Sequence, residues 1–123
     1  MDAARISLTI ARDPALVRTV RLVAAAVARR TGQDEQFVEE VRLAVGEACA
    51  LLVSDGSTGE VNVRLSLDDR LQVDVESDGV GPPQGPMPSI ESLEPWALLG
   101  ALADDFSAQH KDGHTTVSMS WPL

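Results

Sequence analysis

Two alternating segments joined by a short turn constrain the fold of this chain most strongly. Both have an apolar residue at every second position: Val61, Val63, Leu65 and Leu67 in the first, and Leu71, Val73 and Val75 in the second. A period of two is typical of a strand with one apolar face, and Asp68-Asp69 between the segments predicts an antiparallel hairpin. The polar face of this hairpin is expected to be exposed to solvent, and the apolar face needs a second layer to cover it.

Two amphipathic helices are predicted before the hairpin. The first begins at Asp13-Pro14, a favourable start for a helix, and ends at Thr31-Gly32. The second runs from about Asp34 to Ser54, with its apolar residues in one arc. These residues are Phe37, Val38, Val41, Ala44, Val45, Ala48, Leu51 and Leu52. Glu39, Arg42, Gly46 and Cys49 are predicted on the far side of this helix.

The remaining segments complete a small sheet. A strand is predicted at Ile6 to Ile10, a third helix at 93–105, and a short strand at 106–110. After a turn at Asp112-Gly113, the last strand points Val117, Met119 and Trp121 inward. Residues 78–88 are too rich in Gly and Pro for regular structure, and form either a functional loop or a linker. The prediction is an α+β fold, a two-layer sandwich whose mixed, mostly antiparallel sheet carries helices on one face.

Length and composition indicate one soluble domain over residues 1–123, with 44% apolar and 24% charged residues. The 10 basic and 19 acidic residues give a net charge of −9, which argues against nucleic-acid binding because that requires clustered Lys and Arg. No apolar stretch approaches the ~20 residues that span a bilayer. The N-terminus lacks a signal-peptide pattern, and the single Cys49 cannot form an internal disulfide. We therefore expect a cytoplasmic protein without membrane contact.

A few polar residues are candidates for chemistry or binding. Glu47 lies at the rim of the apolar arc of the second helix, where its carboxylate either points into a cleft or reaches out to water. The arginines of the first helix form either a solvated face or a face for a protein partner. His110 and His114 are expected to be ordinary surface residues, since no ligand cluster completes a metal site around them.

Three segments, taken in order, carry a resemblance. They are Leu43-Ala-Val-Gly-Glu47-Ala-Cys-Ala-Leu51, then Val75-Glu-Ser-Asp-Gly79-Val-Gly81, and then Ala101-Leu-Ala-Asp104 followed by Gly113-His-Thr-Thr-Val117. Together they resemble the GHKL ATPase superfamily, also called HATPase, and within it the anti-sigma-factor serine kinases of bacterial stress and sporulation control. The resemblance covers nearly the whole chain.

The resemblance implies a nucleotide site that this sequence keeps only in part. Glu47 matches the glutamate that polarises the attacking hydroxyl in the family. The asparagine that holds Mg²⁺ in the family corresponds to Leu51, which has no oxygen to offer a hard cation. The aspartate that accepts from the adenine amino group corresponds to Ser77.

In the other motifs of the implied site, some family residues are present and others are replaced. Asp78-Gly79 and Gly81 remain from the adenine motif, although Asp78-Gly79 is also an ordinary turn at a strand end. Leu93 and Pro95 stand where the family has two glycines whose backbone N–H groups meet phosphate oxygens. The final Gly-x-Thr-Thr is kept as Gly113, Thr115 and Thr116, which a turn and a strand start would equally require.

The resemblance and these replacements together favour an anti-sigma regulatory protein that has lost or reduced its kinase chemistry and has little or no nucleotide binding. The resemblance implies a homodimer that sequesters an alternative sigma factor and is released by an anti-anti-sigma partner with a STAS domain. The alternative is an active ATP-dependent serine protein kinase with Glu47 as its base and ATP and Mg²⁺ as cofactors. A third possibility is a module that binds a small molecule in the former nucleotide cleft.

Overall fold

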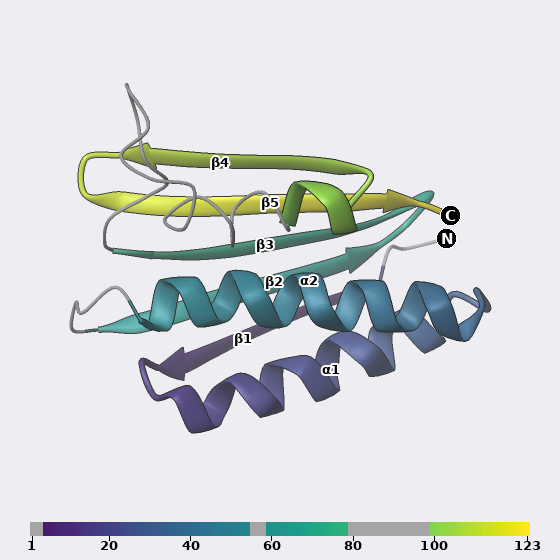
Figure 1. Cartoon of the computed structure of the whole chain (residues 1–123), viewed down its shortest axis with the longest axis horizontal. Helices are drawn as coiled ribbons and strands as arrows, with labels where there is room; N and C mark the ends of the chain where they lie inside the picture. Colours follow the sequence, from purple (N-terminus) through teal and green to yellow (C-terminus); the bar gives the residue numbers. More distant parts are fainter. Residues whose placement is uncertain (1–3, 55–58, 79–98) are drawn as a thin grey trace.

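Five strands form one sheet in the order β1-β2-β3-β5-β4 in the computed structural model, which describes residues 4–54, 59–78 and 99–123 (Figure 1). The strands are β1 (Ala4–Ala11), β2 (Glu60–Leu67), β3 (Arg70–Asp78), β4 (Asp105–Lys111) and β5 (His114–Pro122). Each neighbouring pair is antiparallel, with no parallel pair among the described strands. The predicted hairpin is confirmed as β2 and β3, in which Val63 lies opposite Val75.

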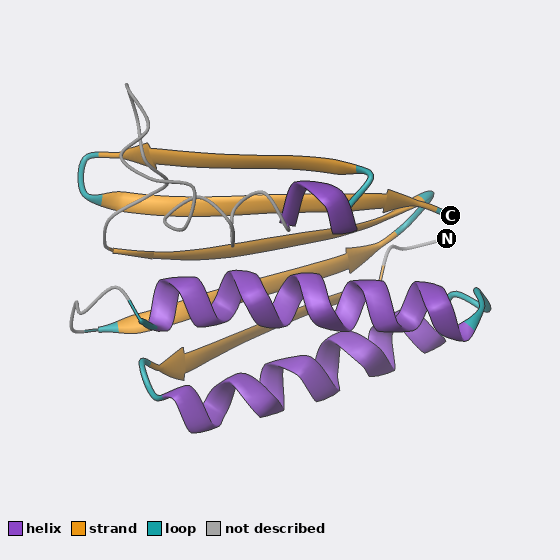
Figure 2. Cartoon of the chain, viewed as in Figure 1, coloured by secondary structure: helices purple, strands orange, loops and turns teal. Residues whose placement is uncertain are grey.

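The two long helices lie together on one face of the sheet, as expected for a two-layer α+β sandwich (Figure 2). A 3₁₀ turn, η1 (Pro14–Leu16), leads into α1 (Val17–Arg29), and α2 (Glu35–Val53) follows. Both predicted starts carry a side-chain cap. An Asp13 carboxylate oxygen accepts from the Ala15 amide at 2.9 Å, and the Asp34 carboxylate accepts from the Phe37 amide at 3.0 Å.

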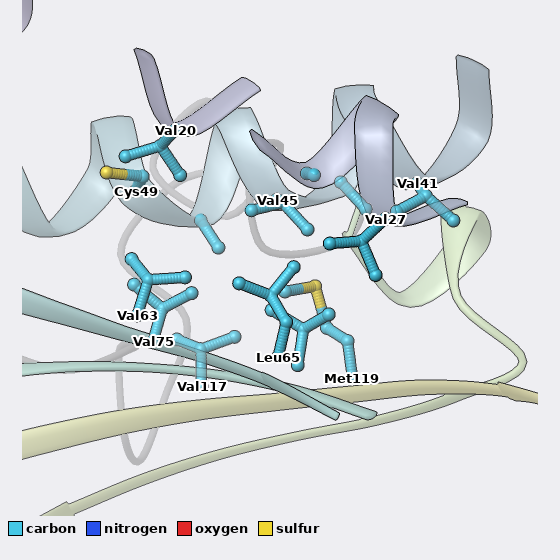
Figure 3. Close-up of a cluster of buried hydrophobic side chains, with 14 of the residues drawn as sticks. Val20, Val27, Val41, Val45, Cys49, Val63, Leu65, Val75, Val117 and Met119 are labelled. Carbon is cyan, nitrogen blue, oxygen red and sulfur yellow. The ribbon is translucent and has the colours of Figure 1, made fainter. Parts of the chain in front are cut away.

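Aliphatic side chains from both layers meet between the helices and the sheet (Figure 3). Val20 and Val27 come from α1, and Val41 and Val45 from α2. They lie above residues of three strands: Val63, Leu65, Val75, Val117 and Met119. Trp121, predicted as a core residue, is 1% exposed and completes the core near the end of β5.

Gly46 and Cys49 are not on a solvent-facing side of α2, so that prediction was wrong. Both are buried, because α1 packs along α2 and covers a second side of this helix. A single apolar arc on a helix predicts only one covering layer, here the sheet. α2 is instead held between the sheet below and α1 at its flank.

The third predicted helix extends too far toward the C-terminus. Its described part covers residues 99–102, and Asp105 is already the first residue of β4. Asp105 lies opposite Ser120 and forms an ion pair with Arg70 at 2.5 Å, contacts that place it in the sheet. The irregular segment predicted at residues 78–88 does not include its first residue, because Asp78 still belongs to β3. Residues 79–98 lie outside the described part of the chain.

The turn between β4 and β5 agrees with the sequence. Asp112 and Gly113 both have positive φ, 55° and 76°. This pair of left-handed residues matches the twist of a tight hairpin, and Asp-Gly is among the residue pairs that tolerate it best. The turn sets the register that places His110 opposite Thr115.

Candidate functional site

Glu47 and Leu51 lie one turn apart on α2, and both side chains are half-buried. α2 contacts β2 and β3, so the two residues belong to the layer that covers the sheet. Among the described residues, Glu47 has no hydrogen bond or ion pair that would bind or orient its carboxylate. The structure therefore leaves Glu47 at the rim of the core, as predicted, with the apolar Leu51 one turn further along the helix.

A second group of predicted residues lies together where β3 ends and β5 begins. Ser77 pairs with Thr115, Asp78 with His114, and Glu76 with Thr116. Ser77 and Thr115 are 2% and 0% exposed, on the helix-covered side of the sheet. The structure brings these strand residues together, and the described hydrogen bonds do not connect them to Glu47 or Leu51.

The buried floor formed by Ser77 and Thr115 is uncharged. The Ser77 hydroxyl donates to the Asp78 carbonyl oxygen at 3.3 Å. Thr115 Oγ1 lies 2.8 Å from Nδ1 of His110, which is half-buried instead of lying on the surface as predicted. A serine hydroxyl both donates and accepts, whereas a carboxylate only accepts. Ser77 and Thr115 therefore do not provide the ionised carboxylate that would accept specifically from the adenine amino group.

Arg12 is a residue that sequence reasoning missed. Its two terminal nitrogens donate to the carbonyl oxygens of Leu52, in the last turn of α2, and of Asp78, at the end of β3. A cation at a helix C-terminus also complements the negative end of the helix dipole. Arg12 thus ties the helix that carries Glu47 to the strand that carries Ser77. These contacts link positions 40 and 66 residues apart, so no local pattern could have indicated them.

His114 lies between two carboxylates on the solvent side of the sheet. Its Nδ1 is 3.1 Å from Asp78 Oδ1, and its Nε2 is 3.4 Å from Glu76 Oε2. The hydrogen bond with Asp78 is the main cause that raises the pKa of His114 above its ordinary value of 6.5, and the contacts with Glu76 add to it. This cluster was not foreseen, because it depends on the pairing of β3 with β5.

A family comparison agrees with this arrangement of helices and strands. Residues 10–121 match the family described as the histidine kinase-like ATPase domain. The chain belongs to this family.

Two relatives that match this chain over most of their length are both named serine-protein kinase RsbW. A protein of Bacillus velezensis named serine-protein kinase RsbW is 31% identical over 94% of this chain and 83% of its own. The RsbW of Bacillus subtilis is 28% identical over 97% of this chain and 86% of its own. The chain is thus a relative of the RsbW proteins within the family.

A solved structure supports the fold. The crystal structure of the RsbU and RsbW domains of Rv1364c from Mycobacterium tuberculosis superposes with a TM-score of 0.77 at 20% identity. The match covers 98% of this chain but only 32% of that longer one. At this identity the likeness concerns the fold, and it places the described helices and strands in the arrangement expected for a histidine kinase-like ATPase domain.

The family implies ATP with Mg²⁺, and the described residues do not fit that metal. Leu51 is apolar, and Mg²⁺ in such sites is held by oxygen ligands. Glu47 alone remains as a carboxylate on this part of α2.

Several predicted positions lie outside the described residues. These are Gly79 and Gly81 of the adenine motif, and Leu93 and Pro95 at the phosphate glycines. Thr116 is described; it is half-buried on the solvent side of the sheet, whereas Thr115 next to it points inward. No helix in the described ranges is long and apolar enough to cross a membrane.

Proposed function

We propose that this protein is an anti-sigma regulator that acts by binding and has lost phosphoryl transfer. It sequesters an alternative sigma factor and is released when an anti-anti-sigma protein with a STAS domain competes for it. The observation that carries this proposal is the pair Glu47 and Leu51: the base position is kept, but its neighbour one turn on is a half-buried leucine. Phosphoryl transfer depends on a metal that bridges the phosphates, and leucine cannot hold one.

The outer surface of α1 supports binding to a protein partner. This helix has no acidic residue, although the whole chain carries a net charge of −9. Arg18 is exposed, and Leu22 beside it is 65% exposed. Exposed apolar area within a charged surface is typical of a protein interface, and arginine is enriched in such interfaces.

Arg21 adds a polar anchor to that surface. A groove of about 230 Å³ lies between α1 and α2, lined by Pro14, Val17, Arg21, Ala50, Val53 and Ser54. The Nε atom of Arg21 is buried and has no hydrogen-bond partner in the described structure. A buried donor without a partner is unfavourable by about 1–3 kcal/mol. An acidic side chain of a bound protein that entered the groove would remove this penalty.

Two measurements test the proposal together. Titration calorimetry with Mg²⁺-ATP and Mg²⁺-ADP up to millimolar ligand is expected to show no heat of binding. Purified sigma factors from the same genome are then titrated with the wild type, E47Q and R21Q. We expect E47Q to bind like the wild type and R21Q to bind at least tenfold more weakly, with the exposed R29Q as the matched charge control.

An active serine protein kinase remains the second candidate, because the RsbW relatives carry that name. It predicts micromolar binding of Mg²⁺-nucleotide and phosphorylation of a serine on a STAS-domain protein. E47Q would then abolish phosphorylation while the protein keeps its fold. That combination would overturn the binding-only proposal.

We further propose that the protein is a homodimer. β1 is an edge strand of the sheet, so one side of its backbone has no neighbouring strand among the described residues. Ile6 on this strand is 39% exposed, an apolar residue that a second copy could cover. Sedimentation velocity at tens of micromolar protein tests this, and a monomer at that concentration would contradict it.

A further inference from the structure

We propose that His114 is a proton-operated clamp: its protonated form holds the end of β3 against β5 through Glu76 and Asp78, and its neutral form releases one of the two carboxylates. This inference concerns a device in the fold and does not depend on the proposed function. It rests on the positions of three side chains on the solvent face of the sheet.

Each ring nitrogen of His114 lies next to a carboxylate oxygen. Nδ1 faces Asp78 at 3.1 Å and Nε2 faces Glu76 at 3.4 Å. An ionised carboxylate only accepts hydrogen bonds, and a neutral imidazole has one N–H and one bare nitrogen. Neutral His114 therefore satisfies one carboxylate and turns a lone pair toward the other, whereas the imidazolium satisfies both.

Because this cluster lies at the end of β3, protonation of His114 affects how firmly that strand end is held. Asp78 is the last residue of the strand, and its backbone carbonyl is held by Arg12 from the other side of the sheet's end. His114 is the first residue of β5 and lies directly opposite Asp78. The clamp thus adds a side-chain link where the ladder ends, the place at which strands fray most easily.

Several other charged groups lie near His114 and its two carboxylate partners. Arg64 on β2 also binds Glu76, at 2.7 Å, and so competes for that carboxylate. Lys111 lies opposite His114 across the β4–β5 hairpin, and Asp112 follows it in the turn. Arg12 places a second positive charge at Asp78, because it donates to the backbone carbonyl oxygen of that residue. The carboxylate of Asp78 still makes the contact that raises the pKa of His114 most.

The direction of the pH effect follows from the raised pKa of His114. A histidine whose folded pKa is above its unfolded value stabilises the fold fully below the unfolded pKa. This stabilisation is lost as the pH rises through the folded value. The clamp is therefore closed at and below about pH 6.5, the ordinary value, and opens as the pH rises through the higher pKa of His114 in the folded protein.

An NMR titration of the His114 ring tests the electrostatic part. The midpoint in the folded wild type is expected above that in the urea-unfolded chain. D78N is expected to lower the folded midpoint by about half a pH unit or more, and D78N with E76Q by more than D78N alone. D105N is the matched control, because it removes the same charge at the far end of β4. Equal midpoints in the folded and unfolded chains, or an equal shift in D105N, would overturn the clamp.

Hydrogen exchange tests the structural part. After correction for intrinsic rates, amides of residues 76–78 and 114–116 should exchange at least threefold more slowly at pH 6 than at pH 8.5 in the wild type. H114Q should lose this difference, since it cannot be protonated. H114K should keep the slow exchange at both pH values, because its charge is permanent. Equal pH dependence in the wild type and H114Q would show that His114 does not operate a clamp.

Discussion

Arg21 of α1 lies directly across Gly46 of α2. A Cβ atom at position 46 would stand 2.8 Å from Cγ and 3.0 Å from Cδ of Arg21, closer than ordinary side-chain contacts. Glycine in the middle of a helix is less favourable than alanine by about 1 kcal/mol, so this position needs a packing reason. The missing side chain lets the arginine lie flat between the two helices with its Nε buried.

Gly46→Ala therefore tests a coupling between two helices. In the wild type, the gain in helix propensity should be offset because Arg21 must leave its place. In an R21A background, the same substitution should raise the free energy of unfolding by about 1 kcal/mol. Urea denaturation of the four proteins in this double-mutant cycle measures the difference. Equal effects of Gly46→Ala in both backgrounds would mean that the two residues are independent.

Arg12→Ala is expected to lower the free energy of unfolding by about 1–2 kcal/mol, because two carbonyl oxygens lose a charged donor. The carbonyls belong to Leu52 and Asp78, so the loss should be greatest where α2 meets β3. R12K keeps the charge but not the forked geometry, and should retain part of the stability. R5Q is the matched control, since Arg5 is an exposed residue of β1. A loss in R5Q as large as that in R12A would assign the effect to net charge.

The fold could be predicted largely because its signals are local. The alternation in β2 and β3 and the apolar stripes of α1 and α2 each repeat with the period of their own element. Asp13 and Asp34 mark the helix starts through contacts two and three residues away. The burial of Gly46 and Cys49 could not be read in this way, because it depends on where α1 packs after both helices have formed.

The site was harder to predict for a similar reason. Ser77 and Thr115 were picked out by resemblance, and the register of β3 with β5 now places them side by side. Arg12 and the cluster around His114 consist of residues far apart in the sequence that only the sheet brings together. An arginine after a strand or a histidine after a turn has no spacing that would distinguish it from a surface residue.

Trp121 links β5 to the described helical segment 99–102. Its Nε1 donates to the Leu102 carbonyl at 3.0 Å, and its ring meets Phe37 edge to face at 6.5 Å. W121F removes the donor and part of the ring but keeps an aromatic contact, so we expect unfolding to become easier by about 2 kcal/mol. W121L, which also loses the aromatic contact, should be less stable than W121F. Thermal and urea denaturation followed by circular dichroism measure both variants, and equal stability of W121F and wild type would contradict the role of this link.

Cys49 should be inert toward alkylation in the folded protein. Burial raises the pKa of its thiol to about 11, and nearby Arg21 lowers it only in part. At pH 8 about one thiol in a thousand is then ionised, and the thiolate is the reactive form. Iodoacetamide is expected to label the folded chain at least a hundredfold more slowly than the urea-unfolded chain. Because the folded pKa is raised, the thiol stabilises the fold below about pH 9, and this contribution is lost as the pH rises toward 11. R21A removes the opposing charge and should slow the labelling further, so faster labelling in R21A would show instead that α1 has opened away from α2.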